Sequence, residues 1–264
     1  MVDPAPLTGG PVSLVLVRHG ETTWIREGRF QGRADPPLSE TGLRQAARVG
    51  DRLADPGAAP ALPIPPGAPG IVLSSPLRRA AVVADGIAAG YGVRPEHDPD
   101  LAEIDQGAWE GLTTAEVVSR YGPELAAWRR TPAAAHAPGG EPLVTAAERA
   151  GRSAGRLLAR ITPPAAAPGD PAAIPGSHVL GYGRPGTDGE PWPWAVVVAH
   201  DGILRLLLLG LLGLPIERYW TVPFGLCAIT VLEARHGIVR LRAHNLADHL
   251  DGLGDGADGR PPAR

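Results

Sequence analysis

Two histidines stand where apolar segments of the sequence end. His19 follows the β-branched run 12–17 by one residue, and His200 directly follows the similar run 195–199. A histidine at the end of a buried strand has a fixed backbone while its ring can face a crevice, where it can act as a nucleophile or in proton transfer. For either motif taken alone, a histidine that only satisfies a turn explains the sequence equally well.

Two arginines and a carboxylate could complete a site with these histidines. Arg18 adjoins His19, and Arg79 falls in the first turn of a helix predicted over 76–89, whose N-terminus favours anions. Glu103 has apolar and glycine neighbours. Such a set suits phosphoryl transfer without a metal: guanidinium groups bind phosphoryl oxygens, one imidazole attacks phosphorus, the other stabilises charge, and a carboxylic acid protonates the departing oxygen.

Alternating strands and helices must position these side chains. The patterns predict strands over 12–17, 71–74 and 195–199, helices over 39–54, 76–89, 113–121, 145–161 and 203–212, and a terminal hairpin over 228–233 and 238–243. Ser39 is the expected N-cap of its helix, and Leu43 lies on the stripe expected to be buried. The alternation predicts an α/β fold, a three-layer α/β/α arrangement with a mostly parallel central sheet. Because ligands gather at the carboxyl ends of parallel strands, residues 18–19, 74–75 and 200 should converge.

Composition excludes several classes of protein. The 264 residues carry 25 basic side chains, all arginine, and 28 acidic ones, a net charge of −3 that gives no field for nucleic acid or an acidic membrane surface. Without lysine there is no Schiff-base or P-loop lysine, and the single cysteine excludes an internal disulfide. The apolar run 203–214 is too short to span a membrane. We therefore expect no nucleic-acid or membrane partner. Because the N-terminus lacks the pattern of a secretory signal, we also expect a cytoplasmic protein.

Proline and glycine crowd into a few stretches of the chain. These stretches predict a flexible N-terminal tail over 1–11, one domain over 12–250 and a flexible C-terminal tail over 251–264. Within the domain, 162–194 is a Pro/Gly-rich insertion. Disorder is the simpler interpretation of its composition, and a substrate lid is the alternative.

Together these motifs resemble the histidine phosphatase superfamily, which includes cofactor-dependent phosphoglycerate mutases and many phosphatases. The resemblance extends over 14–250, and its most specific part is the RHGET motif at 18–22 with the AHDG segment at 199–202. It implies a phosphoglycerate mutase-like fold. It also implies that His19 becomes phosphohistidine, that Arg18, Arg79 and His200 form the phosphate pocket, and that Glu103 is the proton donor.

The resemblance also assigns substrate-binding residues, with one departure. Gly202 matches a position where a backbone amide approaches the phosphate. Ile25 stands where the family often has an asparagine that reaches the phosphate, and Gln31 is a candidate replacement, with Gly32 beside it. Arg78, the neighbour of Arg79, is expected to be a solvated helix residue. No metal and no cofactor is expected.

The family resemblance leaves three functions open. The PGGE segment at 138–141 favours a phosphatase for a small phosphorylated metabolite, whereas the segment Trp128-Arg129-Arg130 offers a clamp of the kind that a phosphoglycerate mutase needs. A non-catalytic phosphate-binding module is disfavoured because all five site residues are present. The C-terminal part resembles the branch that contains α-ribazole and sugar-phosphate phosphatases, and the family resemblance also allows a homo-oligomer.

Overall fold

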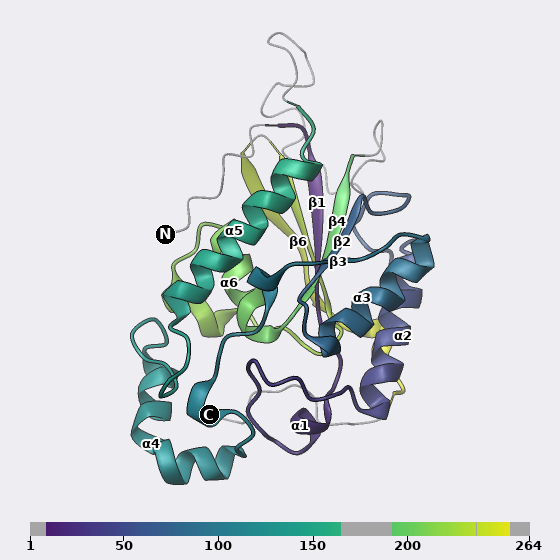
Figure 1. The fold of residues 1–264 in the computed structure, drawn as a ribbon. Coiled ribbons are helices and arrows are strands. Elements are labelled where there is room, and N and C mark those ends of the chain that lie inside the picture. Colours follow the sequence, from purple (N-terminus) through teal and green to yellow (C-terminus); the bar gives the residue numbers. More distant parts are fainter. Residues whose placement is uncertain (1–8, 165–191, 236, 254–264) are drawn as a thin grey trace.

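A six-stranded sheet forms the centre of the protein (Figure 1). The computed structural model describes residues 9–164, 192–235 and 237–253, so the expected tails and insertion lie largely outside the described residues. The strands are β1 (Val12–Arg18), β2 (Ile71–Ser74), β3 (Glu96–His97), β4 (Trp194–Ala199), β5 (Ile229–Arg235) and β6 (Ile238–Leu246). Their order is β3-β2-β4-β1-β5-β6, with β5 antiparallel to both neighbours and the other pairs parallel. The predicted, mostly parallel sheet is confirmed.

The helices of the protein are α1 (Thr23–Arg26), α2 (Glu40–Ala54), α3 (Arg78–Tyr91), α4 (Thr114–Arg130), α5 (Leu143–Ile161) and α6 (Asp201–Leu211). Two helices cover each face of the sheet, α2 and α3 on one and α5 and α6 on the other. Side chains alternate along β1, so that Leu14 and Leu16 pack with α5 and α6 while Val15 and Val17 pack with α2 and α3. Both faces of β1 are therefore buried, which explains its unbroken apolar sequence. The three-layer α/β/α prediction is confirmed.

Several details of the predicted helices are wrong. Leu43 is 51% exposed, because the close packing of Gly42 against the backbone of Glu21 turns the neighbouring face of α2 inward. α3 begins at Arg78, two residues after the predicted start. α4 runs on to Arg130 past a break at Tyr121, where the backbone leaves helical angles and a second helical segment follows.

No helix in the described ranges has the length and apolar character needed to cross a membrane.

Candidate active site

His19 and His200 lie side by side at one edge of the sheet. β1 and β4 are parallel neighbours with Arg18 opposite Ala199, so the residues that follow them emerge together. The two imidazole rings are 5.0 Å apart between centroids at an interplanar angle of 60°. Ser75, which follows β2, lies 2.7 Å from His200 Nε2 through its hydroxyl oxygen. The predicted convergence of these three strand ends is confirmed.

His19 is held in its neutral form. Its Nδ1 lies 2.7 Å from the carbonyl oxygen of Gly20, and because a carbonyl can only accept, Nδ1 carries the hydrogen. The lone pair is then on Nε2. Burial lowers the pKa of His19 well below its ordinary value, and the charges of Arg79 and Arg18 lower it further. The ring therefore stays unprotonated near neutral pH, as nucleophilic attack requires.

Two guanidinium groups stand beside the histidines, that of Arg79 buried and that of Arg18 half-buried. Arg18 donates through Nη1 to the Phe224 carbonyl oxygen at 2.7 Å. Arg79 is fully buried and donates to the carbonyl oxygens of Ala34 at 2.7 Å and Gly32 at 2.8 Å. Guanidinium groups keep their charge in proteins, so these backbone contacts fix the position of two positive charges.

Three buried nitrogen atoms of this cluster are unsatisfied within the described part of the chain. They are Arg18 Nε, Arg79 Nε and His200 Nδ1. Buried polar groups are normally paired, and such exceptions concentrate at functional sites. The oxygens of a phosphoryl group can accept from donors of this kind, so the cluster has the charge and the hydrogen-bonding capacity of an anion pocket.

Glu103 faces the N-terminus of α6. Its Oε1 accepts from the backbone N–H of Ile104 at 2.9 Å and of Ile203 at 3.2 Å, and its Oε2 accepts from Gly202 N–H at 3.2 Å. Burial raises the pKa of Glu103 above its ordinary value, and the nearby charge of Asp201 adds to this rise, although these hydrogen bonds and Arg79 oppose it. A carboxyl group with a raised pKa can keep its proton and act as a general acid.

Gly202 is glycine because there is no space for a side chain. A Cβ atom there would lie 2.7 Å from Glu103 Oε1 and 2.6 Å from Ile104 Cδ1. In this structure the Gly202 amide donates to Glu103, whereas its contact with phosphate stays a prediction.

The loop that carries Gln31 and Gly32 borders the pocket. The Thr22 hydroxyl accepts from Ile25 N–H and donates to Gln31 Oε1 at 2.8 Å, which leaves the Gln31 amide nitrogen available as a donor. The Gly32 carbonyl oxygen accepts from Arg79. Gly32 is therefore held against Arg79, and the contact of Gln31 and Gly32 with substrate stays a prediction.

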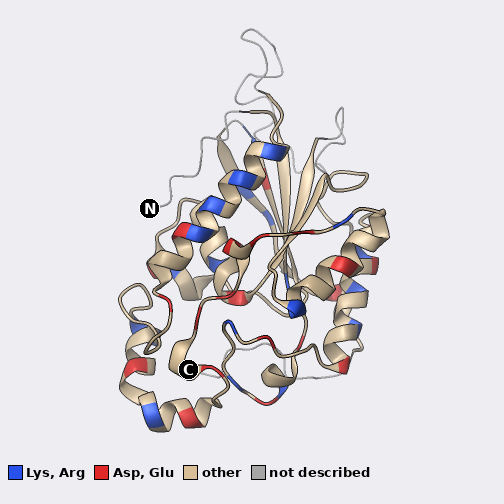
Figure 2. Cartoon of the chain, in the orientation of Figure 1, with Lys and Arg blue, Asp and Glu red and all other residues tan. Residues whose placement is uncertain are grey.

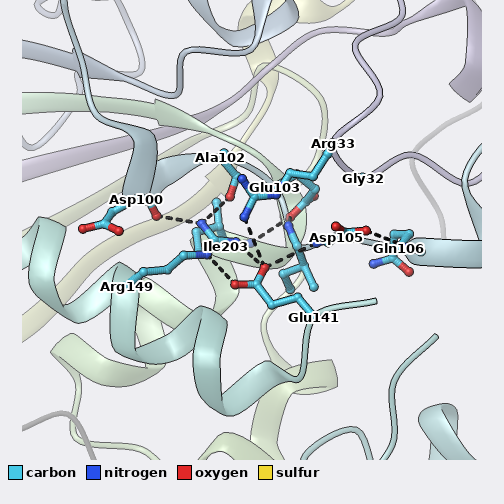
Figure 3. Close-up of polar contacts among 12 residues, drawn as sticks. Gly32, Arg33, Asp100, Ala102, Glu103, Asp105, Gln106, Glu141, Arg149 and Ile203 are labelled. Atoms are coloured by element: carbon cyan, nitrogen blue, oxygen red, sulfur yellow. Dashed lines mark hydrogen bonds and ion pairs between the residues drawn. The ribbon is translucent and has the colours of Figure 1, made fainter. Parts of the chain in front are cut away.

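Arg149 of α5 holds the segment that carries Glu103, although no sequence motif marked it (Figure 3). Its Nη1 donates to the carbonyl oxygens of Asp100 at 2.7 Å and Ala102 at 2.5 Å. Its Nε and Nη2 each donate to Glu141 at 2.8 Å. The side chain is only 7% exposed, so this pairing fixes the backbone directly before Glu103 from within the protein.

The same segment is tied to α5 by a row of surface ion pairs. Figure 2 shows arginines spaced along α5 beside the acidic segment 96–100, which crosses in front of the sheet. Arg156 contacts Asp98 at 2.7 Å and Asp100 at 2.8 Å, and Arg160 contacts Glu96 at 2.7 Å. Helical arginines four residues apart are usual on solvated faces, so the sequence alone gives no sign of these contacts.

Comparison with known proteins identifies the family. The profile described as the histidine phosphatase superfamily (branch 1) matches residues 14–163 and 186–247. The chain belongs to the histidine phosphatase superfamily. The family match therefore covers most of the chain and includes the segments that carry the clustered histidines and arginines.

Among its relatives, this histidine phosphatase is similar to two curated enzymes. It is 31% identical to a glucosyl-3-phosphoglycerate phosphatase of Mycolicibacterium vanbaalenii, over 89% of this chain and 86% of the relative. It is 26% identical to phosphoserine phosphatase 1 of Hydrogenobacter thermophilus, over 90% of this chain and 94% of the relative. Its fold is similar to that of a mycobacterial glucosyl-3-phosphoglycerate phosphatase solved in complex with inorganic phosphate, with a TM-score of 0.68, 28% identity, and 90% and 98% of the two chains covered.

Proposed function

We propose that this histidine phosphatase hydrolyses phosphate monoesters of small metabolites through a phosphohistidine formed on His19, without a metal ion. The observation that carries the proposal is the state of His19. Its hydrogen is held on Nδ1 by a carbonyl oxygen, its pKa is lowered, and it stands beside two fixed guanidinium charges. Arg18 and Arg79 supply the positive charge that a metal supplies in other phosphatases, and His200, whose pKa burial lowers well below its ordinary value, acts as a neutral hydrogen-bonding group.

In the first step the enzyme takes the phosphoryl group. Arg18, Arg79 and His200 bind the phosphoryl oxygens, and His19 Nε2 attacks phosphorus as the bond to the ester oxygen breaks. Glu103 gives its proton to that oxygen, so the alcohol leaves neutral. The raised pKa of Glu103 supports this role, because the carboxyl group must carry a proton at the start.

In the second step water releases the phosphoryl group. The Glu103 carboxylate takes a proton from a water molecule whose oxygen attacks phosphorus, and the bond between phosphorus and His19 Nε2 breaks with its electron pair returning to nitrogen. Inorganic phosphate leaves, and Glu103 is again protonated. The two steps therefore return both side chains to their starting states.

The comparisons favour this phosphatase over the phosphoglycerate mutase. The relatives reported above are named as phosphatases. The structure also gives little support to the basic clamp expected of a mutase. Trp128 packs between Trp109 and Trp220 at 5.6 and 4.6 Å between ring centroids, and Arg129 and Arg130 are exposed.

The test is phosphate release by the purified protein, with and without a chelator, from a panel of aryl, sugar and carboxylate-bearing phosphates. We expect release in both conditions, complete loss in His19→Ala, and a phosphoryl group on His19 detected by mass spectrometry during turnover. His136→Gln, which changes an exposed histidine, serves as the control. Loss with chelator that a divalent ion restores contradicts the metal-free mechanism. Interconversion of phosphoglycerates instead of release supports the mutase, and phosphate binding without either reaction supports a non-catalytic module.

The expected cytoplasmic location and the homo-oligomer stay predictions. Gel filtration of the purified protein tests the second of them.

A further inference from the structure

Arg33 stands on a loop that is fixed against the phosphate pocket. The preceding carbonyl, that of Gly32, accepts from Arg79 at 2.8 Å. Glu110 binds the next two amides: its Oε1 accepts from Arg33 N–H at 2.6 Å and its Oε2 from Ala34 N–H at 2.9 Å. Because these contacts hold the backbone on both sides, the Arg33 side chain starts from a fixed point next to the buried guanidinium of Arg79.

The Arg33 side chain reaches the segment that carries the proton donor. Its Nη2 lies 3.5 Å from Glu141 Oε2. The same carboxylate oxygen accepts from the backbone N–H of Asp105 at 3.3 Å, two residues after Glu103. Figure 3 shows Arg33 and Glu103 in this cluster. Arg33 therefore bridges the space between the pocket loop and the wall from which Glu103 acts.

The charge of Arg33 is only weakly compensated by Glu141. Both oxygens of Glu141 already accept from Arg149 at 2.8 Å, a paired arrangement that matches one carboxylate with one guanidinium. The contact of Glu141 with Arg33 is longer, 3.5 Å, and the Arg33 side chain is 42% exposed. One carboxylate thus faces two guanidinium groups, and the second of them keeps a positive charge and N–H donors for another partner.

We propose that Arg33 binds a carboxylate on the alcohol part of the substrate, and so selects phosphate monoesters of hydroxy acids. This inference rests on the proposed function, in which the ester oxygen lies at Glu103 during proton transfer. The rest of the alcohol then extends from the pocket along the wall that Arg33 reaches. A guanidinium recognises a carboxylate through two parallel N–H donors, and a neutral hydroxymethyl group cannot replace that partner.

Two substrates that differ only at the relevant group provide the test. 3-Phosphoglycerate has a carboxylate where glycerol 3-phosphate has a hydroxymethyl group. We expect the wild-type protein to prefer 3-phosphoglycerate in kcat/KM, and Arg33→Gln to reduce that ratio by about tenfold, the usual size of one charge-assisted contact at a partly exposed site. Arg33→Lys, which keeps the charge without the planar fork, should restore part of the preference. Arg152→Gln removes a charge from an exposed side chain of α5 and should leave the ratio unchanged.

The outcomes separate this inference from the proposed function. Equal kcat/KM for the two substrates in the wild type, or an unchanged ratio in Arg33→Gln, overturns the role of Arg33 while phosphatase activity stands. If no substrate releases phosphate, the proposed function fails, and calorimetric binding still decides the inference. His19→Ala should then bind 3-phosphoglycerate more tightly than glycerol 3-phosphate, and the double variant with Arg33→Gln should lose the difference. Binding without any preference overturns the inference in that case too.

Discussion

Replacing Glu103 by glutamine removes the acidic proton of the carboxyl group while keeping the size of the side chain. The glutamine oxygen can still accept from Ile104 and Ile203, whereas its amide nitrogen would face the Gly202 N–H that now donates to Oε2 at 3.2 Å. Two donors then face each other. Losing one hydrogen bond and leaving a buried donor unpaired costs about 1–3 kcal/mol of stability, so the variant should fold.

The expected effect on catalysis is larger and depends on the leaving group. A positioned general acid contributes about 10²–10⁴ in rate, and an amide cannot supply the proton. At about 1.4 kcal/mol per factor of ten, this is roughly 3–5 kcal/mol of lost transition-state stabilisation for an alkyl phosphate, whose alcohol leaves poorly. An activated aryl phosphate leaves without protonation, so its loss should be much smaller.

The assay is kcat/KM for an alkyl and an aryl phosphate in the wild type and in Glu103→Gln. This ratio reports the steps up to departure of the alcohol, whereas kcat also includes the water step, in which Glu103 acts as a base for both substrates. Glu148→Gln, the same change at an exposed carboxylate of α5, is the control. Equal losses in kcat/KM for the two substrates would refute the role of Glu103 as the proton donor.

Two further predictions follow from burial. At acid pH the rate with an alkyl phosphate should fall only below the usual range of a histidine pKa, because His19 must be neutral and its pKa is lowered. At alkaline pH the rate should fall as Glu103 loses its proton, and this should happen above the usual range of a carboxyl pKa, because the pKa of Glu103 is raised. An acid limb within the ordinary histidine range of the kcat/KM profile would contradict this. Arg149→Met should cost about 3–5 kcal/mol in urea unfolding, because it removes the donors of the Ala102 carbonyl and leaves Glu141 with only its longer contacts to Arg33 and to Asp105 N–H. The exposed Arg152→Gln should cost less than about 1 kcal/mol. Similar small losses in both variants would show that the buried pair is not structural.

The meeting of the two histidines was predictable because it follows from topology. Parallel strands present their carboxyl ends at one edge, so two apolar runs that each end next to a histidine indicate one crevice. The neighbouring arginines were also distinguished correctly: Arg79 is buried while Arg78 is exposed. The family profile confirms the resemblance on which the expected roles rest, and those roles stay predictions for this chain.

The support of the Glu103 segment was not predictable from local pattern. Arg149 lies on α5, yet it fixes the backbone 49 and 47 positions earlier, and Glu141, just before α5, binds an amide 36 positions earlier. An arginine on a helix is most often solvated. Glu110 likewise holds the amides of Arg33 and Ala34 across 77 and 76 positions of sequence. Such contacts depend on how loops cross, which neither hydrophobic period nor capping signals determine.

Burial prepares both reacting groups in opposite directions. It lowers the pKa of His19 and so favours the neutral imidazole, and it raises the pKa of Glu103 and so favours the protonated carboxyl group. In each case the neutral form is the one that a low-polarity site favours. Arg79 assists the first shift and opposes the second. An arriving phosphate monoester partly cancels the charge of Arg79, so its binding should raise the pKa of Glu103 further and hold the proton where the alcohol needs it. In the proposed mechanism the alcohol then takes that proton, the carboxylate remains beside the phosphohistidine as the base for water, and one side chain serves both steps.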